Sequence, residues 1–229
     1  MKPKIVVFTG AGISAESGIK TFRDSGGLWE NYQIEQVATP EGWARNPKLV
    51  LDFYNQRRIQ ANNAEPNKGH LALVTLEEKY DVHIITQNVD NLHERAGSSK
   101  ITHLHGELTK SRSSLEPSLI YDVRGNFLNM GDLCELGSQL RPHIVWFGEA
   151  VPEMSRAIDI MQNVDVFIVI GTSMQVYPAA SLMDYVSNNT AIYVIDPDAP
   201  RVRTNNIEYI TEKASLGVPK MVAQLLKKV

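Results

Sequence analysis

The feature that most constrains this chain is an apolar segment that runs directly into a glycine-rich turn. Residues Lys4 to Thr9, KIVVFT, are rich in β-branched side chains, as is typical of a buried parallel strand. The segment Gly10 to Asp24 follows, with the sequence GAGISAESGIKTFRD. Gly10 and Gly12 allow a sharp turn and a close approach to a diphosphate, which the first amides of the next helix would face. The chain therefore begins as strand, tight turn and helix, the arrangement of nucleotide-binding α/β folds.

The same letters match the fingerprint of dinucleotide-binding proteins, with Ala15 at the third small position. Alone the match is weak, because small residues also follow first strands for packing reasons. A dehydrogenase would show a second apolar strand that ends in an acidic residue about 20 residues further on. This chain instead has GGLWENYQIEQVATPEGW, with glycines, aromatic residues and proline. That stretch predicts an irregular loop over the site and makes hydride transfer the weaker alternative.

Composition narrows the possible partners. The 229 residues include 23 basic and 26 acidic side chains, a balance that provides no electrostatic footprint for nucleic acid or an anionic membrane. The chain has no apolar run of about 18 residues, so we expect a soluble, cytoplasmic protein with no nucleic-acid or membrane partner. Its one cysteine, Cys134, excludes an intrachain disulfide and a cysteine-rich zinc site. The sequence does not indicate an oligomeric state.

The remaining apolar patterns alternate between helical and strand-like spacing. We expect helices over 46–63, 67–79 and 178–188, a short helix ending at Gly97, and a last helix from Val218 onward. Further strands are expected over 81–86, 101–106, 143–147, 165–170 and 191–195. Residues 109–139 carry turn signals and two short β-like runs, which predict an excursion from the main sheet.

These elements predict an α/β fold with a doubly wound parallel sheet and a small inserted module. We expect one domain over residues 1–229, with the module formed from about 24–66 and 109–140. Ligands of such sheets bind beyond the carboxyl ends of the strands. Glycine and polar residues gather there in the segments GAGIS, QNVD, HGE, GEAVP, GTS and DPD, which predict a site built from these loops.

Five longer motifs carry a family resemblance. GAGISAESGI with TFRD, TQNVDNLHERAG, HLHGEL, RPHIVWFGE and GTSMQVYPAA occur in this order, and the chain resembles the sirtuin family of NAD-dependent protein deacylases over nearly its whole length. Sirtuins transfer ADP-ribose from NAD to the acyl oxygen of a modified lysine and release nicotinamide, O-acyl-ADP-ribose and free lysine. The resemblance thus implies a Rossmann-like sheet, NAD as cofactor, and acylated lysine side chains of proteins or peptides as substrates.

The resemblance also implies roles for individual residues. His105 matches the general base, for which a near-neutral imidazole is suited, and Asn88 matches a second catalytic position. The cofactor-binding positions are Gly10, Ala11, Gly12, Ser14, Ala15, Phe22, Arg23, Gln87, Asn88, Asp90, Gly171, Thr172, Ser173, Asp196 and Ala214. The other histidines, His70, His83, His93, His103 and His143, lie in helix or strand patterns and are interpreted as structural.

Two segments resemble the substrate-binding parts of sirtuins. Val145, Trp146, Phe147 and Gly148 match the stretch that pairs with an extended peptide and encloses the lysine stem, although each ring could equally be core. Tyr54 and Arg57 share one helical face. Sirtuins that remove succinyl, malonyl or glutaryl groups carry a tyrosine and an arginine at this spacing, so the resemblance implies an acidic-acyl preference. The alternative is an exposed cation beside a half-buried ring.

The chain departs from the family at the structural zinc site. Sirtuins typically have two cysteine pairs there, whereas SRSSLEP and GDLCELG retain only Cys134, with Ser113 near the first cysteine position. A tetrahedral site needs four donors, so we predict no zinc. The module would then be held by apolar contacts of Leu115, Leu119, Ile120, Phe127, Leu128, Leu133 and Leu136.

Two alternatives to a deacylase remain. One is a catalytically silent NAD or ADP-ribose-binding module, against which the presence of His105, Asn88 and Asp90 argues. The other is a protein ADP-ribosyltransferase, which the sequence does not exclude. Nicotinamide release and the mass of the product distinguish the three.

Overall fold

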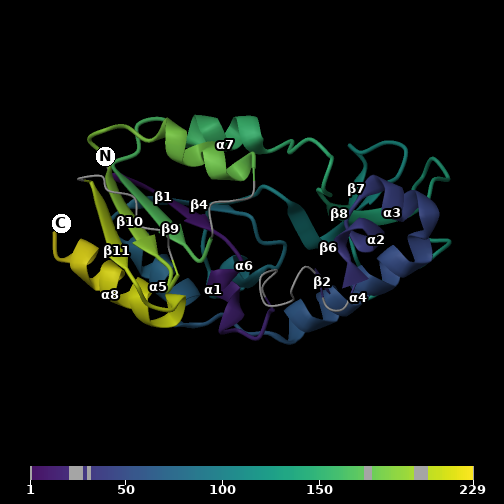
Figure 1. Ribbon diagram of the computed structural model, residues 1–229, viewed down its shortest axis with the longest axis horizontal. Coiled ribbons are helices and arrows are strands. Elements are labelled where there is room, and N and C mark those ends of the chain that lie inside the picture. Colours follow the sequence, from purple (N-terminus) through teal and green to yellow (C-terminus); the bar gives the residue numbers. More distant parts are fainter. Residues whose placement is uncertain (1, 21–27, 30–31, 173–176, 199–205, 229) are drawn as a thin grey trace.

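The larger part of the protein is built around a six-stranded parallel sheet (Figure 1). The computed structural model describes residues 2–20, 28–29, 32–172, 177–198 and 206–228. The strand order is β11-β10-β9-β1-β4-β5. The bounds are β1 Lys4–Thr9, β4 Asp81–Thr86, β5 Ile101–His103, β9 Val166–Ile170, β10 Ala191–Ile195 and β11 Ile207–Ile210. After β1 the chain adds β4 and then β5 on one side of it. It then adds β9, β10 and β11 on the other side, so the winding direction reverses between β1 and β9.

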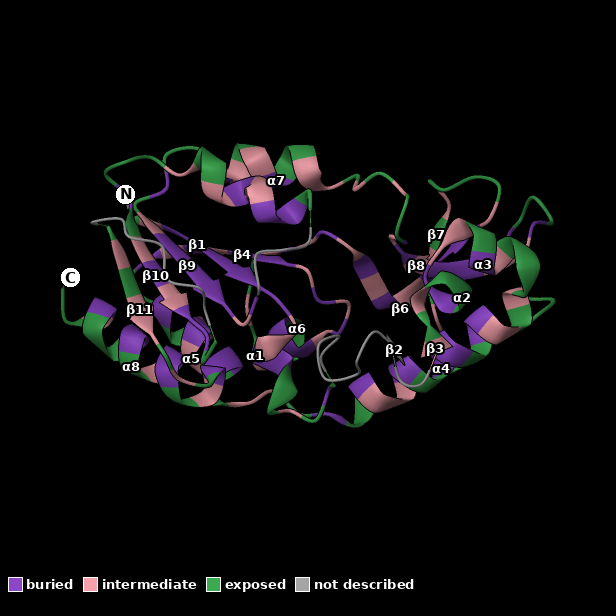
Figure 2. Ribbon diagram, viewed as in Figure 1, coloured by how far each residue is buried: buried purple, intermediate pink, exposed green. Residues whose placement is uncertain are grey.

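Helices cover both faces of this sheet, and strand β1 shows why its sequence lacks polar alternation. Ile5 and Val7 pack in one core cluster with helices α5 and α8, whereas Val6 and Phe8 pack in another with helix α7. All four side chains are fully buried, as Figure 2 shows for the strands of this sheet. The helices are α1 Gly12–Ala15, α5 Lys68–Leu76, α6 Leu92–Ala96, α7 Met154–Ile160, the 3₁₀ helix η2 Ala179–Tyr185, and α8 Ala214–Leu226.

A small module lies beside the parallel sheet, and we use this name for the elements β2, β3, α2, α3, α4, β6, β7 and β8 (Figure 1). Their bounds are β2 Leu28–Trp29, β3 Tyr32–Gln33, α2 Ile34–Val37, α3 Pro40–Arg45, α4 Pro47–Asn63, β6 Gly106–Ser113, β7 Ile120–Asp122 and β8 Leu140–Ile144. Strands β7, β6 and β8 form an antiparallel sheet in that order. Helix α4 begins as predicted, because the side chain of Asn46 accepts from the backbone N–H of Leu49 at 3.1 Å.

The strand predicted over 143–147 as part of the main sheet is wrong. Strand β8 spans Leu140–Ile144 instead and pairs with β6 in the small module. The chain leaves the parallel sheet at Gly106, whose φ of +83° lies in the left-handed region. A Cβ atom there would overlap the carbonyl oxygen of His143, so glycine permits this strand pairing.

Other differences lie near the carboxyl end of the chain. Strand β11 and helix α7 were not predicted from the sequence. The 3₁₀ helix η2 is shorter than the helix predicted over 178–188. Helix α8 begins at Ala214, earlier than the predicted Val218, and contains Pro219 in its interior. The carboxylate of Glu16 accepts from the backbone N–H and the hydroxyl of Ser215, at 2.9 and 2.8 Å. This contact stabilises the start of α8 and is invisible to local periodicity.

The predicted apolar replacement for the zinc site is also largely wrong. Leu128 is 4% exposed, but Leu115, Ile120, Phe127, Leu133 and Leu136 are exposed. Hydrogen bonds hold these loops instead: the hydroxyl oxygens of Ser113 and Ser138 are 2.6 Å apart, and the Ser138 hydroxyl lies 3.1 Å from Cys134 Sγ. Within the described ranges, no cluster of His, Cys, Asp and Glu side chains is placed to hold a metal ion. No helix among these residues is long and apolar enough to span a membrane.

Candidate active site

The glycine turn after β1 packs against the turn after β9, where the winding direction of the sheet reverses. The backbone N–H of Gly12 donates to the carbonyl oxygen of Gly171 at 2.8 Å, and that of Gly10 donates to Ile170 at 3.0 Å. A Cβ atom on Gly12 would lie 2.5 Å from the Cα of Gly171, and one on Gly10 would lie 2.7 Å from the Cβ of Thr172. Close packing therefore requires both glycines. Helix α1, which follows, is a single turn that carries Ser14 and Ala15.

Ser14, Asn88 and Asp90 form a buried polar cluster beside this turn. The Ser14 hydroxyl donates to Asp90 Oδ2 and accepts from Asn88 Nδ2, both at 3.1 Å. The backbone N–H of Leu92 donates to Asp90 Oδ1 at 3.1 Å. Burial raises the pKa of Asp90, an effect that these two hydrogen bonds to its carboxylate oppose. The fold thus brings together three predicted site residues from two distant segments.

Gln87, the residue before Asn88, has a side-chain amide with one oriented oxygen and one buried donor. Its Oε1 accepts from the Thr172 hydroxyl at 2.9 Å, which orients the amide. Its Nε2 is buried and has no hydrogen-bond partner among the described residues. A buried donor without a partner destabilises the folded protein by about 1–3 kcal/mol, so a ligand that offers an acceptor to this N–H would recover that free energy. The glycine turns, the hydroxyls and this amide fit NAD, the cofactor expected from the sequence.

The geometry of His105 fixes which ring nitrogen is basic. Its Nδ1 lies 3.1 Å from the carbonyl oxygen of Gln87. A carbonyl oxygen only accepts, so Nδ1 carries the hydrogen and Nε2 of the neutral ring keeps its lone pair. Burial lowers the pKa of His105, partly offset by this hydrogen bond. The ring is therefore neutral near pH 7 and has a free-base nitrogen.

The predicted peptide-binding segment adjoins His105. The backbone N–H of Val145 donates to the carbonyl oxygen of His105, and that of Phe147 to the carbonyl oxygen of Ala38, both at 3.0 Å. The side chain of Trp146 is buried, whereas Phe147 is exposed and Gly148 has φ of +90°. Trp146 is thus a core ring, and Phe147 and Gly148 lie at the surface.

Tyr54 and Arg57 lie inside the small module, at 1% and 7% exposure, so the alternative of an exposed cation is wrong. Tyr54 accepts at its hydroxyl oxygen from Trp146 Nε1 at 3.1 Å. Burial raises the pKa of Tyr54, while the Trp146 hydrogen bond and the charge of Arg57 act in the opposite direction. Arg57 Nη1 donates to Gln60 Oε1 at 2.9 Å, and Gln60 Nε2 donates to the carbonyl of Gly18 at 3.2 Å.

The remaining predicted residues lie at the same edge of the sheet or outside the described ranges. Asp196 directly follows β10 and accepts from the backbone N–H of Asp198 at 2.8 Å. Ala214 is the buried first residue of α8. Ala11 follows Gly10 in the turn. Phe22, Arg23 and Ser173 lie outside the described residues.

Sequence reasoning missed three residues that support the site. Gln60 binds Arg57, and Arg141 stacks over Trp146 with its guanidinium carbon 3.3 Å from the ring centroid. Glu149 accepts from Arg141 at 2.7 and 3.0 Å and from Arg112 at 3.2 and 3.1 Å. Gln60 lies one helical turn from Arg57 and could have been identified by its spacing, whereas the pairing of Glu149 with Arg112 joins segments 37 residues apart.

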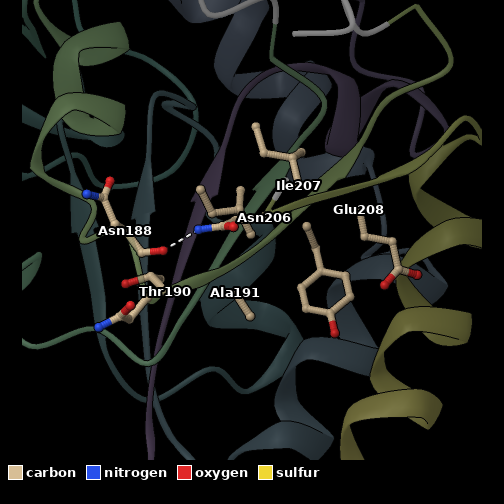
Figure 3. Close-up of a pocket in the computed structure, with 9 residues that line it drawn as sticks. Asn188, Thr190, Ala191, Asn206, Ile207 and Glu208 are labelled. Atoms are coloured by element: carbon tan, nitrogen blue, oxygen red, sulfur yellow. Dashed lines mark hydrogen bonds between the residues drawn. The ribbon is translucent and has the colours of Figure 1, made fainter. Parts of the chain in front are cut away.

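An open hollow elsewhere on the protein is unrelated to this site. It lies against the amino ends of β10 and β11 and includes Asn188, Thr190, Asn206 and Glu208 (Figure 3). Asn206 donates from its side-chain amide to the carbonyl of Asn188. The glycine turns and His105 lie at the opposite, carboxyl edge of the sheet.

Comparisons with known proteins agree with this geometry. The family model described as "Sir2 family" matches residues 10–178. The chain is 54% identical over 224 residues to an NAD-dependent protein deacylase of Helicobacter pylori strain J99, covering 97% of this chain and 95% of that protein. It is 52% identical over 228 residues to an NAD-dependent protein deacylase of Bacteroides thetaiotaomicron, covering 97% of each. A solved structure of a Sir2 homologue in complex with NAD shares 40% identity and a TM-score of 0.88, over 99% of this chain and 91% of that one. The chain therefore belongs to the Sir2 family, which confirms the sirtuin resemblance.

Proposed function

We propose that this protein is an NAD-dependent protein-lysine deacylase that removes succinyl and malonyl groups as well as acetyl groups. The observation that carries the deacylase assignment is the position of His105. Its Nδ1 lies 3.1 Å from the carbonyl oxygen of Gln87, the residue before Asn88 in the buried cluster with Ser14 and Asp90. The relatives named NAD-dependent protein deacylases support the same chemistry. The acidic-acyl preference rests separately on Tyr54 and Arg57.

Bound NAD supplies the ribose that loses nicotinamide and the hydroxyl that must be deprotonated. Gly10, Gly12 and Gly171 keep side chains out of the turns that face it, so that backbone can approach a diphosphate. Gln87 Nε2 donates to an acceptor of the ligand. Asn88 and Asp90, both fixed through Ser14, hold the reacting ribose in one orientation.

His105 acts as the general base in this proposal. Its Nε2 takes the proton of a ribose hydroxyl, and the Nδ1 hydrogen bond to Gln87 strengthens when the ring becomes positively charged. The backbone N–H of Val145 donates to the carbonyl oxygen of His105, and this contact supports a peptide-binding role for the segment next to the proposed base. A substrate peptide would pair with residues 145–148 as an added strand and direct its lysine inward.

The burial of Tyr54 and Arg57 supports recognition of a carboxylate. Arg57 is a buried cation on the same helical face as Tyr54. Because an indole N–H can only donate, the Tyr54 oxygen accepts from Trp146, and the hydroxyl hydrogen of Tyr54 takes no part in that bond. The carboxylate of a succinyl group would pair with the guanidinium and accept from this hydroxyl, forming charge-assisted hydrogen bonds in a dry pocket.

A nicotinamide-release assay with one peptide sequence tests the proposal. The peptide is prepared with acetyl-, malonyl-, succinyl- and unmodified lysine, and the products are weighed by mass spectrometry. We expect nicotinamide and free lysine in equal amounts from the acylated peptides and neither product from the unmodified one. Absence of release from every peptide would indicate a silent binding module, and a product heavier by one ADP-ribose would indicate a transferase. Release from acetyl-lysine alone would overturn the acidic-acyl assignment and leave the deacylase.

A further inference from the structure

His103, the last residue of β5, holds a position between two hydrogen-bond acceptors. Its Nδ1 lies 2.8 Å from the carbonyl oxygen of Asn88, and its Nε2 lies 2.7 Å from Glu94 Oε1 in helix α6. The His103 side chain is 8% exposed, whereas that of Glu94 is 39% exposed. The pair therefore connects a partly solvated carboxylate, through a buried ring, to the backbone of a proposed catalytic residue.

The chemistry of these two acceptors dictates the charge of the ring. A carbonyl oxygen and a carboxylate both lack hydrogens, so each nitrogen of His103 must donate, and only the imidazolium has two N–H groups. Two residues further on, His105 faces a single carbonyl, that of Gln87, and needs one N–H. The end of β5 is thus joined to the loop after β4 by two histidines. The neutral ring of His105 donates to the carbonyl of Gln87, and the cationic ring of His103 donates to the next carbonyl, that of Asn88.

The charges around His103 favour the cation. Burial acts to lower the pKa of His103, but the hydrogen bond and charge of Glu94, the Asn88 carbonyl and the more distant Glu107 raise it above its ordinary value. Glu107 on β6 is itself paired with Lys110 at 2.8 Å. Two other titratable groups interact with His103 electrostatically. These are the Asp90 carboxyl, whose pKa burial raises, and the His93 ring, whose pKa burial lowers.

We propose that His103 and Glu94 are a positioning pair for the deacylation reaction, an inference that rests on the proposed function. Held as an imidazolium by Glu94, His103 fixes the backbone of Asn88. Ser14 fixes the other end of Asn88 by accepting from its side-chain amide. Asn88 is therefore anchored at both its carbonyl and its amide, and His103 is more than the structural histidine that the sequence indicated.

This arrangement produces a pH dependence with a definite sign. Below the raised pKa of His103, both hydrogen bonds are intact. As the pH rises through that pKa, the ring loses one hydrogen and can donate to only one acceptor, so its remaining lone pair faces either the Asn88 carbonyl or the Glu94 carboxylate. The Asn88 loop loosens, and turnover falls on the alkaline side of the profile. His105 acts oppositely, since its protonation removes activity on the acidic side.

The test combines an NMR titration of the histidine rings with the pH profile of kcat. In the unaltered protein, His103 should titrate above the free-histidine value of about 6.5. Glu94→Gln keeps an acceptor oxygen but removes the charge. It should lower the pKa of His103 and move the alkaline limb of kcat to lower pH by the same amount. At a pH above this shifted limb, turnover of the Glu94→Gln variant should be about tenfold below that of the unaltered protein, as expected when a charge-assisted hydrogen bond becomes a neutral one. At low pH it should match the unaltered protein.

Two further variants serve as controls. Glu78→Gln makes the same change at an exposed site near the amino end of β4, and its profile should be unaltered. His103→Gln cannot titrate and should abolish the alkaline limb. The proposal is overturned if His103 titrates at or below the free-histidine value, or if the Glu94→Gln and unaltered profiles coincide. Because the titration of the unaltered protein needs no substitution, misfolding of a variant does not prevent the test. Failure of the proposed function would differ, since no peptide would then release nicotinamide at any pH.

Discussion

The indole nitrogen of Trp146 donates to the hydroxyl oxygen of Tyr54 across 3.1 Å. Both rings are buried, and the bond joins the proposed substrate-binding segment, residues 145–148, to helix α4. Arg141 lies over the Trp146 ring, and Glu149 holds Arg141 and also accepts from the Trp146 backbone N–H at 2.8 Å. The orientation of the proposed acyl-binding tyrosine therefore depends on Arg141 in β8 and Glu149 after it, which hold the Trp146 ring and backbone.

Replacing Arg57 with methionine should separate the acyl specificities. Loss of a buried charge partner for a carboxylate costs about 2–5 kcal/mol, so kcat/KM for succinyl-lysine should fall between about thirtyfold and several thousandfold. The value for acetyl-lysine should change by less than about threefold, since an acetyl group carries no charge. Lys48→Met is the matched control, because Lys48 is an exposed cation on the same helix, paired with Asp52. Equal loss of both activities would remove Arg57 from acyl selection.

Tyr54→Phe should weaken desuccinylation less than Arg57→Met does, because it removes one neutral donor and leaves the guanidinium. It should also destabilise the protein by about 1–3 kcal/mol, since the buried Trp146 N–H loses its acceptor. Urea denaturation measures the second effect, and kinetics with both acyl peptides measure the first. An unchanged free energy of unfolding would show that the Trp146–Tyr54 bond contributes nothing to stability.

His105→Ala should reduce turnover by about two to four orders of magnitude while NAD still binds, the usual effect of losing a general base. Burial lowers the pKa of His105 in the folded protein. The basic form therefore persists below about pH 6.5, where free histidine would already be half protonated. We expect kcat/KM to stay level through that pH and to fall only as the pH drops through the lowered pKa. An acidic limb at or above the free-histidine value would contradict this assignment.

Glu149→Gln should destabilise the small module. Its carboxylate pairs with Arg112 and Arg141, and its side chain keeps 20% exposure, so we expect a loss of about 3 kcal/mol, the low end for a buried pair. Burial acts to raise the pKa of Glu149, but the hydrogen bond and charge of Arg141 lower it overall. The stabilisation is therefore present above the unfolded pKa and disappears as the pH falls through the lowered value.

Chemical denaturation at neutral and acidic pH checks this prediction for Glu149. Glu153→Gln is the control, because Glu153 forms an exposed pair with Arg156 at 3.5 Å and should change stability by less than about 0.5 kcal/mol. Similar losses for both variants would show that the paired carboxylate of Glu149 has no special weight.

The zinc prediction concerns the loops that contain Ser113, Cys134 and Ser138. Protein purified without added metal should contain far less than one zinc per chain by elemental analysis. Chelator should leave both turnover and the midpoint of thermal unfolding unchanged, because hydrogen bonds among these three side chains hold the loops. One tightly bound zinc per chain, or unfolding on chelation, would refute the prediction.

The sequence by itself determined the fold class and the general location of the site. The length and periodicity of apolar runs such as Lys4–Thr9 can be read from neighbouring residues alone. Because glycine and polar motifs follow these runs, a doubly wound sheet with its ligand site at the carboxyl edge could be predicted. The family motifs likewise placed His105, Asn88 and Asp90 together before any coordinates. Helix α4 was correct almost to the residue because its capping signal, Asn46 before Pro47, is also local.

Only the tertiary structure decided which strand joins which sheet, which side chains are buried and which are charged. The left-handed conformation of Gly106 directs the chain into the small module, where β6 pairs with β8. No sequence pattern in either segment identifies the other as its partner. The helical pattern alone left open an exposed cation at Arg57, and packing buries it. His103 looked structural, yet its charge follows from a carbonyl 15 residues away and a carboxylate 9 residues away along the chain. Burial and protonation depend on groups that meet only after folding, and so local sequence patterns do not specify them.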